Sequence, residues 1–286
     1  MTGHGGSVGH AMSGDRLNWA CYGWRRTITI LCFVVYASIG LVLAALTLPV
    51  AYGRCSVPVT IQRRVRYGIH VLCRFLLWFL SITRCSQLCV RPSRDWIQKK
   101  SQKGRILCAN HPTYLDIVVL LSLVPDALCI VKSAALKWPW SRSFVRLAGY
   151  ISNAHAEEAL RVCTERLAQG NCLIVFPEGT RSPVNAINPF QRGLANLLLR
   201  SEAELVTILL ACQPLSLGKQ QAWHQVPLQP YVLYVHVLSP MKENDWLIAL
   251  RRSTQPIQVR VRELNRQLEL HFEEKLNTYG YLRNAD

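Results

Sequence analysis

The chain has 286 residues, half of them hydrophobic, and its 33 basic and 17 acidic side chains give a formal net charge of +16. This length accommodates one sizeable domain with an appendage. Such a basic excess suits nucleic acid, an anionic membrane surface or anionic substrates. Because the sequence has no zinc-finger or other nucleic-acid-binding signature, we expect no nucleic-acid partner.

Positive charge and apolar segments coincide near the N-terminus. Residues 16–94 contain 11 arginines and neither a lysine nor an acidic residue. Within this region, Thr27–Gly53 runs for 27 residues without a charge, and about 20 apolar residues suffice to cross a bilayer. We predict a retained membrane helix here rather than a cleavable signal peptide. The apolar stretch Tyr67–Thr83 contains a histidine and an arginine, so it could be a marginal span, the return arm of a hairpin or an interfacial helix.

These patterns predict three parts: a flexible tail over residues 1–24, membrane-associated helices over 25–84, and the main domain over 85–286. Residues 84–105 are basic and polar, and we expect a linker that follows anionic lipid headgroups. The 11 cysteines are scattered and lack a metal-binding spacing, which indicates free thiols in a reducing compartment. We therefore place the main domain in the cytoplasm, at the inner or plasma membrane if the source is bacterial.

Short apolar runs alternate with helix-like segments in the rest of the chain. Such alternation is typical of a single α/β domain. The expected strands are 106–109, 127–131, 172–176, 205–211 and 231–238, and the expected helices are 114–123, 155–169, 189–200 and 260–279.

A histidine and an aspartate follow the first strand. The run Ile106–Ala109 stops at Asn110, and Asp116 lies five residues after His111. Because five helical steps put two side chains on different faces, His111 must lie in the turn before a helix and Asp116 about one turn inside it. Pro112 suits such a helix start. A histidine held by a carboxylate is a general base with its orienting partner, although a lone histidine near a strand end is more often structural.

A second apolar run, Cys172–Phe176, ends at Pro177 and is followed by a polar turn. Gly179 permits a backbone conformation that other residues avoid. Arg181 offers a planar fork of donors suited to a phosphate or a carboxylate. Since ligands of open α/β sheets bind beyond the carboxyl ends of strands, both turns are candidates for one site.

Together the two stretches resemble a known family. Asn110-His111-x-x-x-x-Asp116 followed by Phe176-Pro177-Glu178-Gly179-Thr180-Arg181-Ser182 is similar to the paired motifs of glycerolipid acyltransferases of the 1-acylglycerol-3-phosphate acyltransferase type. The similarity covers roughly residues 85–240. It implies a single mixed-sheet α/β domain preceded by an N-terminal membrane helix or helical hairpin.

The resemblance also implies a reaction, the transfer of a fatty acyl group from acyl-CoA or acyl carrier protein to the free hydroxyl of a lysophosphatidate-like glycerolipid in phospholipid synthesis. His111 would take the proton of the hydroxyl, and Asp116 would fix the imidazole tautomer. We expect no metal or prosthetic group, because the thioester co-substrate is already activated.

The second motif supplies the expected binding residues. Arg181 would bind the phosphate of the acceptor, while Gly179 and Thr180 let the backbone approach it. Glu178 belongs to the binding motif of the family, although its residue type would equally suit bracing Arg181. Lys132, after the second expected strand, could aid binding of the anionic substrate or be an ordinary solvated lysine.

Two departures from the family leave the acceptor open. The segment Ala148–Asn153 lacks an arginine that the family often carries, and Val206-Thr207-Ile208 lacks a common proline. A glycolipid, an amino-lipid or another specialised lipid is therefore the alternative acceptor. Outside this class the alternatives are a lipid hydrolase, which would consume thioester without an alcohol acceptor, and a silent lipid-binding module. The intact His111–Asp116 pair argues against the binding module. Trp138 and Trp140, beside basic residues, suit a membrane interface or ordinary core packing.

Overall fold

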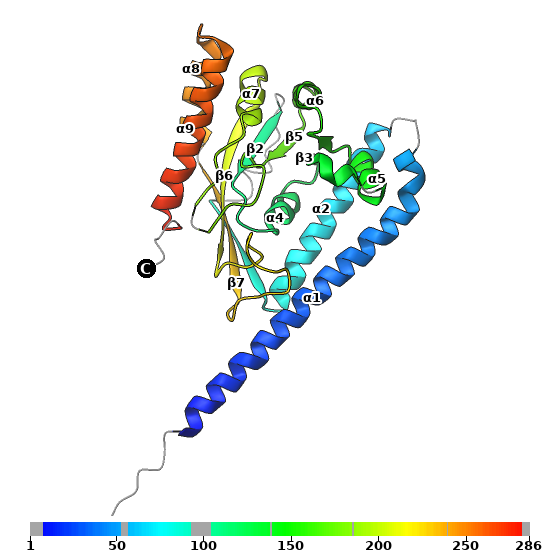
Figure 1. Cartoon of the computed structure of the whole chain (residues 1–286), viewed down its shortest axis with the longest axis vertical. Helices are drawn as coiled ribbons and strands as arrows, with labels where there is room; N and C mark the ends of the chain where they lie inside the picture. Colours follow the sequence, from blue (N-terminus) through cyan, green and yellow to red (C-terminus); the bar gives the residue numbers. More distant parts are fainter. Residues whose placement is uncertain are drawn as a thin grey trace, which may run out of the picture.

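The computed structural model describes residues 8–52, 57–92, 104–137, 139–184, 186–238 and 240–281. Within them, seven strands form one sheet in the order β1-β7-β6-β2-β5-β3-β4 (Figure 1). The strands are β1 (Ser86–Arg91), β2 (Arg105–Ala109), β3 (Ala127–Val131), β4 (Ile151–Ser152), β5 (Cys172–Val175), β6 (Glu204–Gln213) and β7 (Tyr231–Val237). Neighbours pair in parallel except β6 and β7, which are antiparallel. The expectation of one mixed-sheet α/β domain is confirmed.

The central strands are apolar on both faces. Every residue of β2 is buried, as are eight consecutive residues of β6, as expected for strands covered on both sides by helices. Arg105 at the start of β2 is level with Cys172 of β5 and Glu204 of β6. The carboxyl ends of these three parallel strands therefore meet at one edge of the sheet, where the two sequence motifs emerge.

Helices cover both faces of the sheet (Figure 1). One face packs against α1, α2 and α4, and the other against α6 to α9. The helical elements are α1 (Val8–Tyr52), α2 (Val59–Ile82), α4 (Asp116–Leu123), the 3-10 turn η1 (Ser133–Leu136), α5 (Pro139–Ala148), α6 (Ala156–Ala168), α7 (Gly193–Arg200), α8 (Pro240–Arg252) and α9 (Ile257–Thr278).

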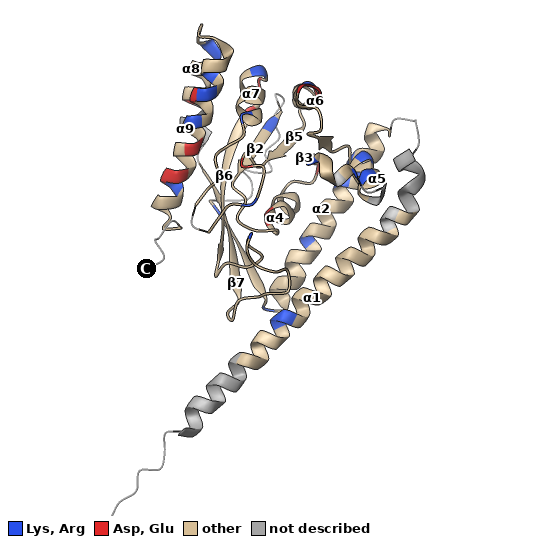
Figure 2. Cartoon of the chain, viewed as in Figure 1, with Lys and Arg blue, Asp and Glu red and all other residues tan. Residues whose placement is uncertain are grey.

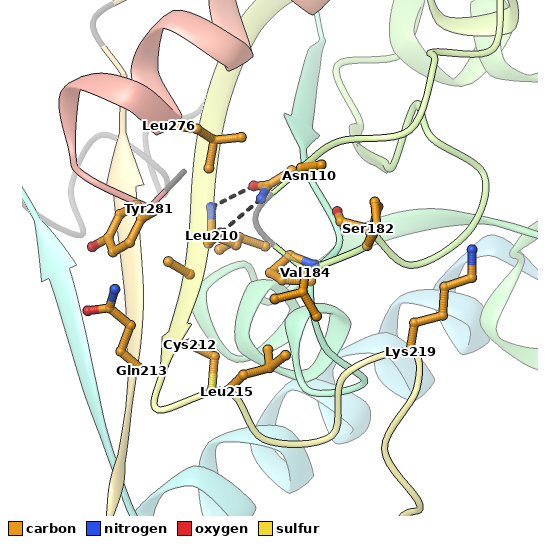
Figure 3. Close-up of a pocket in the computed structure, with 14 residues that line it drawn as sticks. Asn110, Ser182, Val184, Leu210, Cys212, Gln213, Leu215, Lys219, Leu276 and Tyr281 are labelled. Carbon is orange, nitrogen blue, oxygen red and sulfur yellow. Dashed lines mark hydrogen bonds between the residues drawn. The ribbon is translucent and has the colours of Figure 1, made fainter. Parts of the chain in front are cut away.

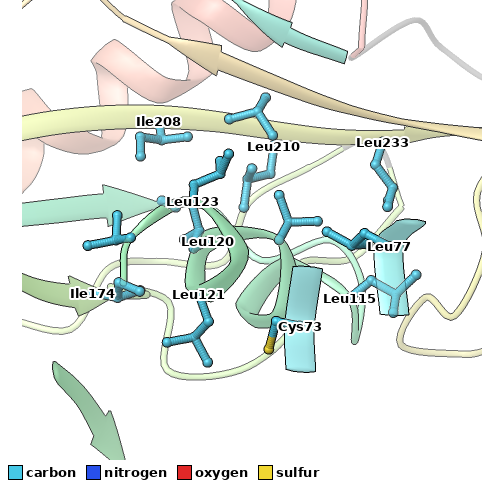
Figure 4. Close-up of a cluster of buried hydrophobic side chains, with 14 of the residues drawn as sticks. Cys73, Leu77, Leu115, Leu120, Leu121, Leu123, Ile174, Ile208, Leu210 and Leu233 are labelled. Atoms are coloured by element: carbon cyan, nitrogen blue, oxygen red, sulfur yellow. The ribbon is translucent and has the colours of Figure 1, made fainter. Parts of the chain in front are cut away.

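Helix α4 lies between the sheet and α2 (Figure 4). Leu120 and Leu123 of α4 belong to the same buried cluster as Ile208 of β6 and Leu77 of α2. The side chain of Arg66 in α2 is only 3% exposed, and it donates to the Asp126 carboxylate at 2.6 Å and to the Ala148 carbonyl at 2.7 Å. Helix α2 thus shares its core with the main domain, although the expected domain boundary falls just after it.

The structure corrects several sequence-based expectations. Residues 86–91, expected within a linker, form edge strand β1, which pairs with β7. Helix α1 begins at Val8, so residues 8–24 of the expected tail are helical. Helix α7 begins at Gly193 rather than at residue 189, and α5 and α8 were not anticipated. Trp138 lies outside the described residues, and so does the side chain of Trp140.

Two helical segments are long and apolar enough to cross a membrane, Trp19–Val42 and Val59–Ile82. The described part of α1 has few charged residues (Figure 2). Helix α2 has two unlike faces. One is buried against the domain, while the other exposes a stripe at three- and four-residue spacing, as one face of a helix requires. The stripe consists of Tyr67, Val71, Phe75, Trp78 and Ile82, each about half exposed.

Residues 214–230, between β6 and β7, form a loop that touches both α1 and the edge of the sheet where the motifs lie. Arg25 of α1 donates to the carbonyl of Leu228, and the ring of Phe33 lies 5.3 Å from that of Trp223. Leu217, in the same loop, has a positive φ of 58° and is buried. A residue other than glycine holds this conformation only where its surroundings impose it, so the path of the loop is well defined at Leu217.

Candidate active site

The structure brings His111 and Asp116 together. The Nδ1 atom of His111 lies 2.8 Å from Oδ2 of Asp116. The carboxylate is buried and the imidazole side chain is 19% exposed. Asp116 is the first residue of α4 rather than one turn inside it, and Pro112 lies in the preceding turn. Because the carboxylate accepts the proton on Nδ1, the lone pair of His111 is on Nε2 and is available to a substrate.

Thr113 fixes the carboxylate from the turn before α4. Its backbone N–H donates to Oδ2 of Asp116 at 2.6 Å and its hydroxyl to Oδ1 at 2.7 Å, while the N–H of Leu115 donates to that hydroxyl at 3.2 Å. These bonds lie in the turn before α4 and hold both oxygens of the carboxylate in place. Burial raises the pKa of Asp116, and the hydrogen bonds from His111 and Thr113 oppose that rise.

Two further contacts hold the His111 turn. The side-chain amide of Asn110 bonds both backbone groups of Leu210 in β6, donating at 2.9 Å and accepting at 2.7 Å. These two bonds tie the segment that follows β2 to β6. The imidazole of His111 stacks on Phe176, with ring centroids 4.3 Å apart and an interplanar angle of 22°. Anchored at its backbone and stacked on one face, the imidazole has little freedom to rotate.

Glu178 joins the two motifs. Its Oε1 accepts hydrogen bonds from the backbone N–H of His111 at 3.1 Å and from the Ser182 hydroxyl at 2.6 Å. Its Oε2 accepts from the backbone and side-chain N–H groups of Asn188, at 2.8 and 2.7 Å. The N–H of Ser182 donates in turn to the carbonyl of His111 at 2.7 Å. Glu178 is therefore a buried carboxylate held by hydrogen bonds that place the second motif against the His111 turn.

The Arg181 side chain lies over the ring of Tyr114, with Cζ 3.6 Å from the ring centroid. One terminal nitrogen donates to the carbonyls of Leu217 and Gly218, at 3.2 and 2.7 Å. Stacking and these bonds orient the guanidinium beside the His111 turn. Gly179, two residues earlier, has a φ of 66°, and a Cβ there would meet only the side chain of Gln191 at 3.5 Å. Glycine is needed here for its backbone conformation rather than for lack of space.

The remaining predicted residues lie further out. Thr180 is half-buried within the second turn. Lys132 is exposed at the end of β3, and β5 separates β3 from β2 in the sheet. Its turn is tied to the end of β4, because the N–H of Ser133 donates to the Asn153 side chain at 2.9 Å. Lys132 thus shares the edge of the sheet with the two motifs but lies two strands away from His111.

A cavity of about 190 Å³ adjoins the two turns (Figure 3). Its lining includes Asn110, Pro112 and Ser182, with Lys219 and Tyr281 at its margins. Among the described residues, His111, Asp116 and Arg181 are not part of this lining. The cavity therefore borders the turns that hold the predicted catalytic groups, without containing those groups.

Sequence reasoning missed three contributors to this arrangement. Thr113 could have been recognised, because a threonine three residues before an acid and an apolar run is a capping-box pattern. Tyr114 and Asn188 carry no such signal, because each meets its partner only after the chain folds.

The arrangement combines a buried carboxylate, an imidazole with one free nitrogen and a fixed guanidinium. Such a group of residues can remove a proton from a hydroxyl while a neighbouring cation holds an anionic substrate. Within the described residues, no group of histidine, cysteine or acidic side chains could hold a metal ion.

Comparison with known proteins finds acyltransferases. The family model described as Acyltransferase matches residues 92–211. A 1-acyl-sn-glycerol-3-phosphate acyltransferase of Limnanthes douglasii is 26% identical over 238 residues, which are 77% of each chain. One from Cocos nucifera is 28% identical over 189 residues, covering 63% of this chain and 56% of that protein. The crystal structure of the 1-acyl-sn-glycerophosphate (LPA) acyltransferase PlsC from Thermotoga maritima matches with a TM-score of 0.56 and 20% identity, over 92% of this chain and 97% of that one.

The structural match shows that the two proteins share a fold. The family match identifies an acyltransferase domain over residues 92–211, and the expectation of an O-acyltransferase is confirmed. The relatives narrow the similarity further: the chain resembles acyltransferases named for 1-acyl-sn-glycerol-3-phosphate.

Proposed function

We propose that the protein transfers a fatty acyl group from the thioester of acyl-CoA or acyl carrier protein to the free hydroxyl of a lysophosphatidate-like glycerolipid. The observation that carries this proposal is the 2.8 Å contact between His111 and Asp116, in a turn bonded directly to the one that carries Arg181. The relatives are named as acyltransferases for 1-acyl-sn-glycerol-3-phosphate, and such an acceptor has a hydroxyl and a phosphate for these two turns.

In the proposed reaction, Nε2 of His111 takes the proton from the acceptor hydroxyl as the oxygen attacks the thioester carbonyl. A carbon–oxygen bond forms, the tetrahedral intermediate collapses, and the carbon–sulfur bond breaks. The leaving thiolate receives the proton from the imidazolium, so atoms and charge balance. Asp116 holds the proton-bearing Nδ1 and stabilises the imidazolium, and general-base catalysis of this kind contributes about 10²–10⁴-fold.

Arg181 would bind the acceptor phosphate with the N–H groups that do not face the loop carbonyls. A lost hydrogen bond to a charged group costs about 1.5–3 kcal/mol, or roughly 10- to 150-fold. We expect Arg181→Ala to raise the KM for lysophosphatidate by this factor and to leave the KM for the acyl donor nearly unchanged. Arg181→Lys should rescue only in part, since it keeps the charge but loses the planar fork.

The control for this experiment is an acceptor without a phosphate. Monoacylglycerol should be a poor acceptor for the wild type and should be used equally by Arg181→Ala. A wild type that prefers monoacylglycerol would contradict the phosphate-binding role and favour the alternative lipid acceptors. Thioester consumption without any acylated lipid product would identify a hydrolase instead.

The protein would work at the surface of a membrane. The buried face of α2 packs on α4, so turning α2 across a bilayer would carry polar groups of the domain into hydrocarbon, at high cost. An orientation along the interface leaves the domain in water and places the Tyr67–Ile82 stripe in the lipid. Arginines on α2 would meet anionic headgroups. The free thiols of the described cysteines support a cytoplasmic location for the domain.

Vesicle flotation tests this orientation. Full-length protein should float with vesicles containing anionic lipid, and high salt alone should not release it. Trp78→Asp should weaken flotation, because the 56% exposed indole lies within the stripe. Leu270→Asp is a matched control, since Leu270 is also half exposed but lies on α9, across the sheet. Equal flotation of the two variants would refute an interfacial role for α2.

A further inference from the structure

Asn188 lies outside both sequence motifs, in the segment that leads to α7, yet it contacts two residues of the second motif. Its backbone N–H and side-chain N–H both donate to Oε2 of Glu178, at 2.8 and 2.7 Å. The same side-chain nitrogen donates to the carbonyl of Arg181 at 3.0 Å. One amide group therefore closes the turn that runs from Glu178 to Arg181.

The Glu178 carboxylate, which Asn188 contacts, is buried. Glu178 is only 3% exposed, and a buried charge is tolerated when it is satisfied by hydrogen bonds. The described contacts of its two oxygens are N–H and O–H donors from His111, Ser182 and Asn188. Half of these bonds come from Asn188. Without its side chain, Oε2 keeps one donor and the carboxylate can shift.

Such a shift would reach the catalytic turn. Oε1 of Glu178 accepts the backbone N–H of His111 at 3.1 Å. The Ser182 hydroxyl, itself bonded to Oε1, accepts the same N–H at 3.2 Å. The carboxylate thus acts on the position of His111 both directly and through Ser182. Catalytic groups require placement to within about half an ångström, and a misplacement of about 1 Å costs on the order of 100-fold.

We propose that Asn188 is a positioning residue for acyl transfer, which acts through Glu178 on His111 and directly on the backbone of Arg181. Glu178 then serves to join the two turns rather than to contact the acceptor. This inference rests on the proposed roles of His111 and Arg181. It differs from a purely structural role in predicting a loss of turnover per folded molecule, and not only a loss of folded protein.

The test compares Asn188→Ala with Asn196→Ala in the full-length protein. Asn196, in α7, also donates its side-chain amide to a backbone carbonyl, that of Arg192, at 2.9 Å, but it does not contact Glu178. We expect Asn188→Ala to lower kcat by about 10-fold, the lower end of the cost of a lost bond to a charged group, because the backbone N–H remains. The KM for the acyl donor should hardly change. Asn196→Ala should keep the kcat of the wild type.

Asn188→Asp provides a second readout that does not depend on the stability of the alanine variant. Two carboxylates in contact share one proton, and a protonated Asp at this position donates to Glu178 as the amide did. The ratio of variant to wild-type kcat should therefore approach one at acidic pH and fall as the pH rises. His111, Asp116 and Arg181 are the same in both proteins, so the wild type measured at each pH serves as the control for them.

The outcomes separate the two proposals. An inactive wild type, or an active His111→Ala, would overturn the proposed function itself. With an active wild type that depends on His111, an unchanged kcat per folded molecule in Asn188→Ala would overturn the role of Asn188. A ratio for Asn188→Asp that does not vary with pH would overturn it as well.

Discussion

Asp116→Asn tests whether the charge of the carboxylate or only its geometry serves His111. Oδ2 accepts N–H groups from His111 and Thr113, whereas Oδ1 faces the Thr113 hydroxyl. An asparagine avoids two donor–donor contacts by turning its carbonyl toward His111 and its amide toward that hydroxyl, which can accept. The imidazole tautomer is then preserved, and only the negative charge is lost.

The magnitude follows from this geometry. Losing a charged hydrogen-bond partner costs about 1.5–3 kcal/mol, so kcat for Asp116→Asn should fall by roughly 10- to 150-fold. His111→Ala removes the base itself and should cost about 10³-fold. The double variant should be little worse than His111→Ala, because residues of one catalytic unit are not additive.

Thiol release at saturating concentrations of both substrates gives these kcat values, and circular dichroism controls for folding. A loss in Asp116→Asn as large as that in His111→Ala would show that the amide faces His111 and that our reading of the Thr113 contacts is wrong. Multiplicative losses in the double variant would contradict the pairing of the two residues.

Two further predictions concern stability. Arg66→Ala should lower the free energy of unfolding by about 1.5–3 kcal/mol, because Arg66 is buried and bonded to Asp126. Arg63→Ala should change it by less than about 1 kcal/mol, since the side chain of Arg63 is 58% exposed in its ion pair with Asp126. Equal shifts in Tm for the two variants in detergent would contradict this difference. Burial and the charge of Arg91 lower the pKa of His236 from its ordinary value of 6.5, so the unfolded chain binds this proton at a higher pH than the folded chain does. The free energy of unfolding should therefore fall as the pH drops below about 6.5, and His236→Gln should flatten that part of a Tm-against-pH curve.

The fold class could be predicted because the central strands are uniformly apolar. The runs at 106–109 and 127–131 stand out from their polar neighbours, and the structure places β2 and β3 there. Strand β1 could not be recognised, because only its first residue is fully buried and arginines flank it. These residues form a strand because they pair with β7, more than 140 residues later in the chain.

The site was predictable only as far as its chemistry is local. His111 and Asp116 meet within one turn, so their spacing in the sequence was enough to predict the contact between them. The bond between Glu178 and His111 joins residues 67 positions apart, and no periodicity indicates it. Arg181 was expected to face a ligand, and the structure adds that its guanidinium is oriented by Tyr114 and by a loop from beyond β6.

The loop over residues 214–230 affects how deletion experiments can be interpreted. It rests on α1 through Arg25 and Phe33, and its backbone holds Arg181. Removing the N-terminal helix to obtain a soluble enzyme would therefore also withdraw a support of the residue proposed to bind the acceptor. A weaker acceptor affinity in such a truncated protein would not measure the contribution of the membrane. Point substitutions on the exposed apolar stripe of α2 leave that support intact and separate the two effects.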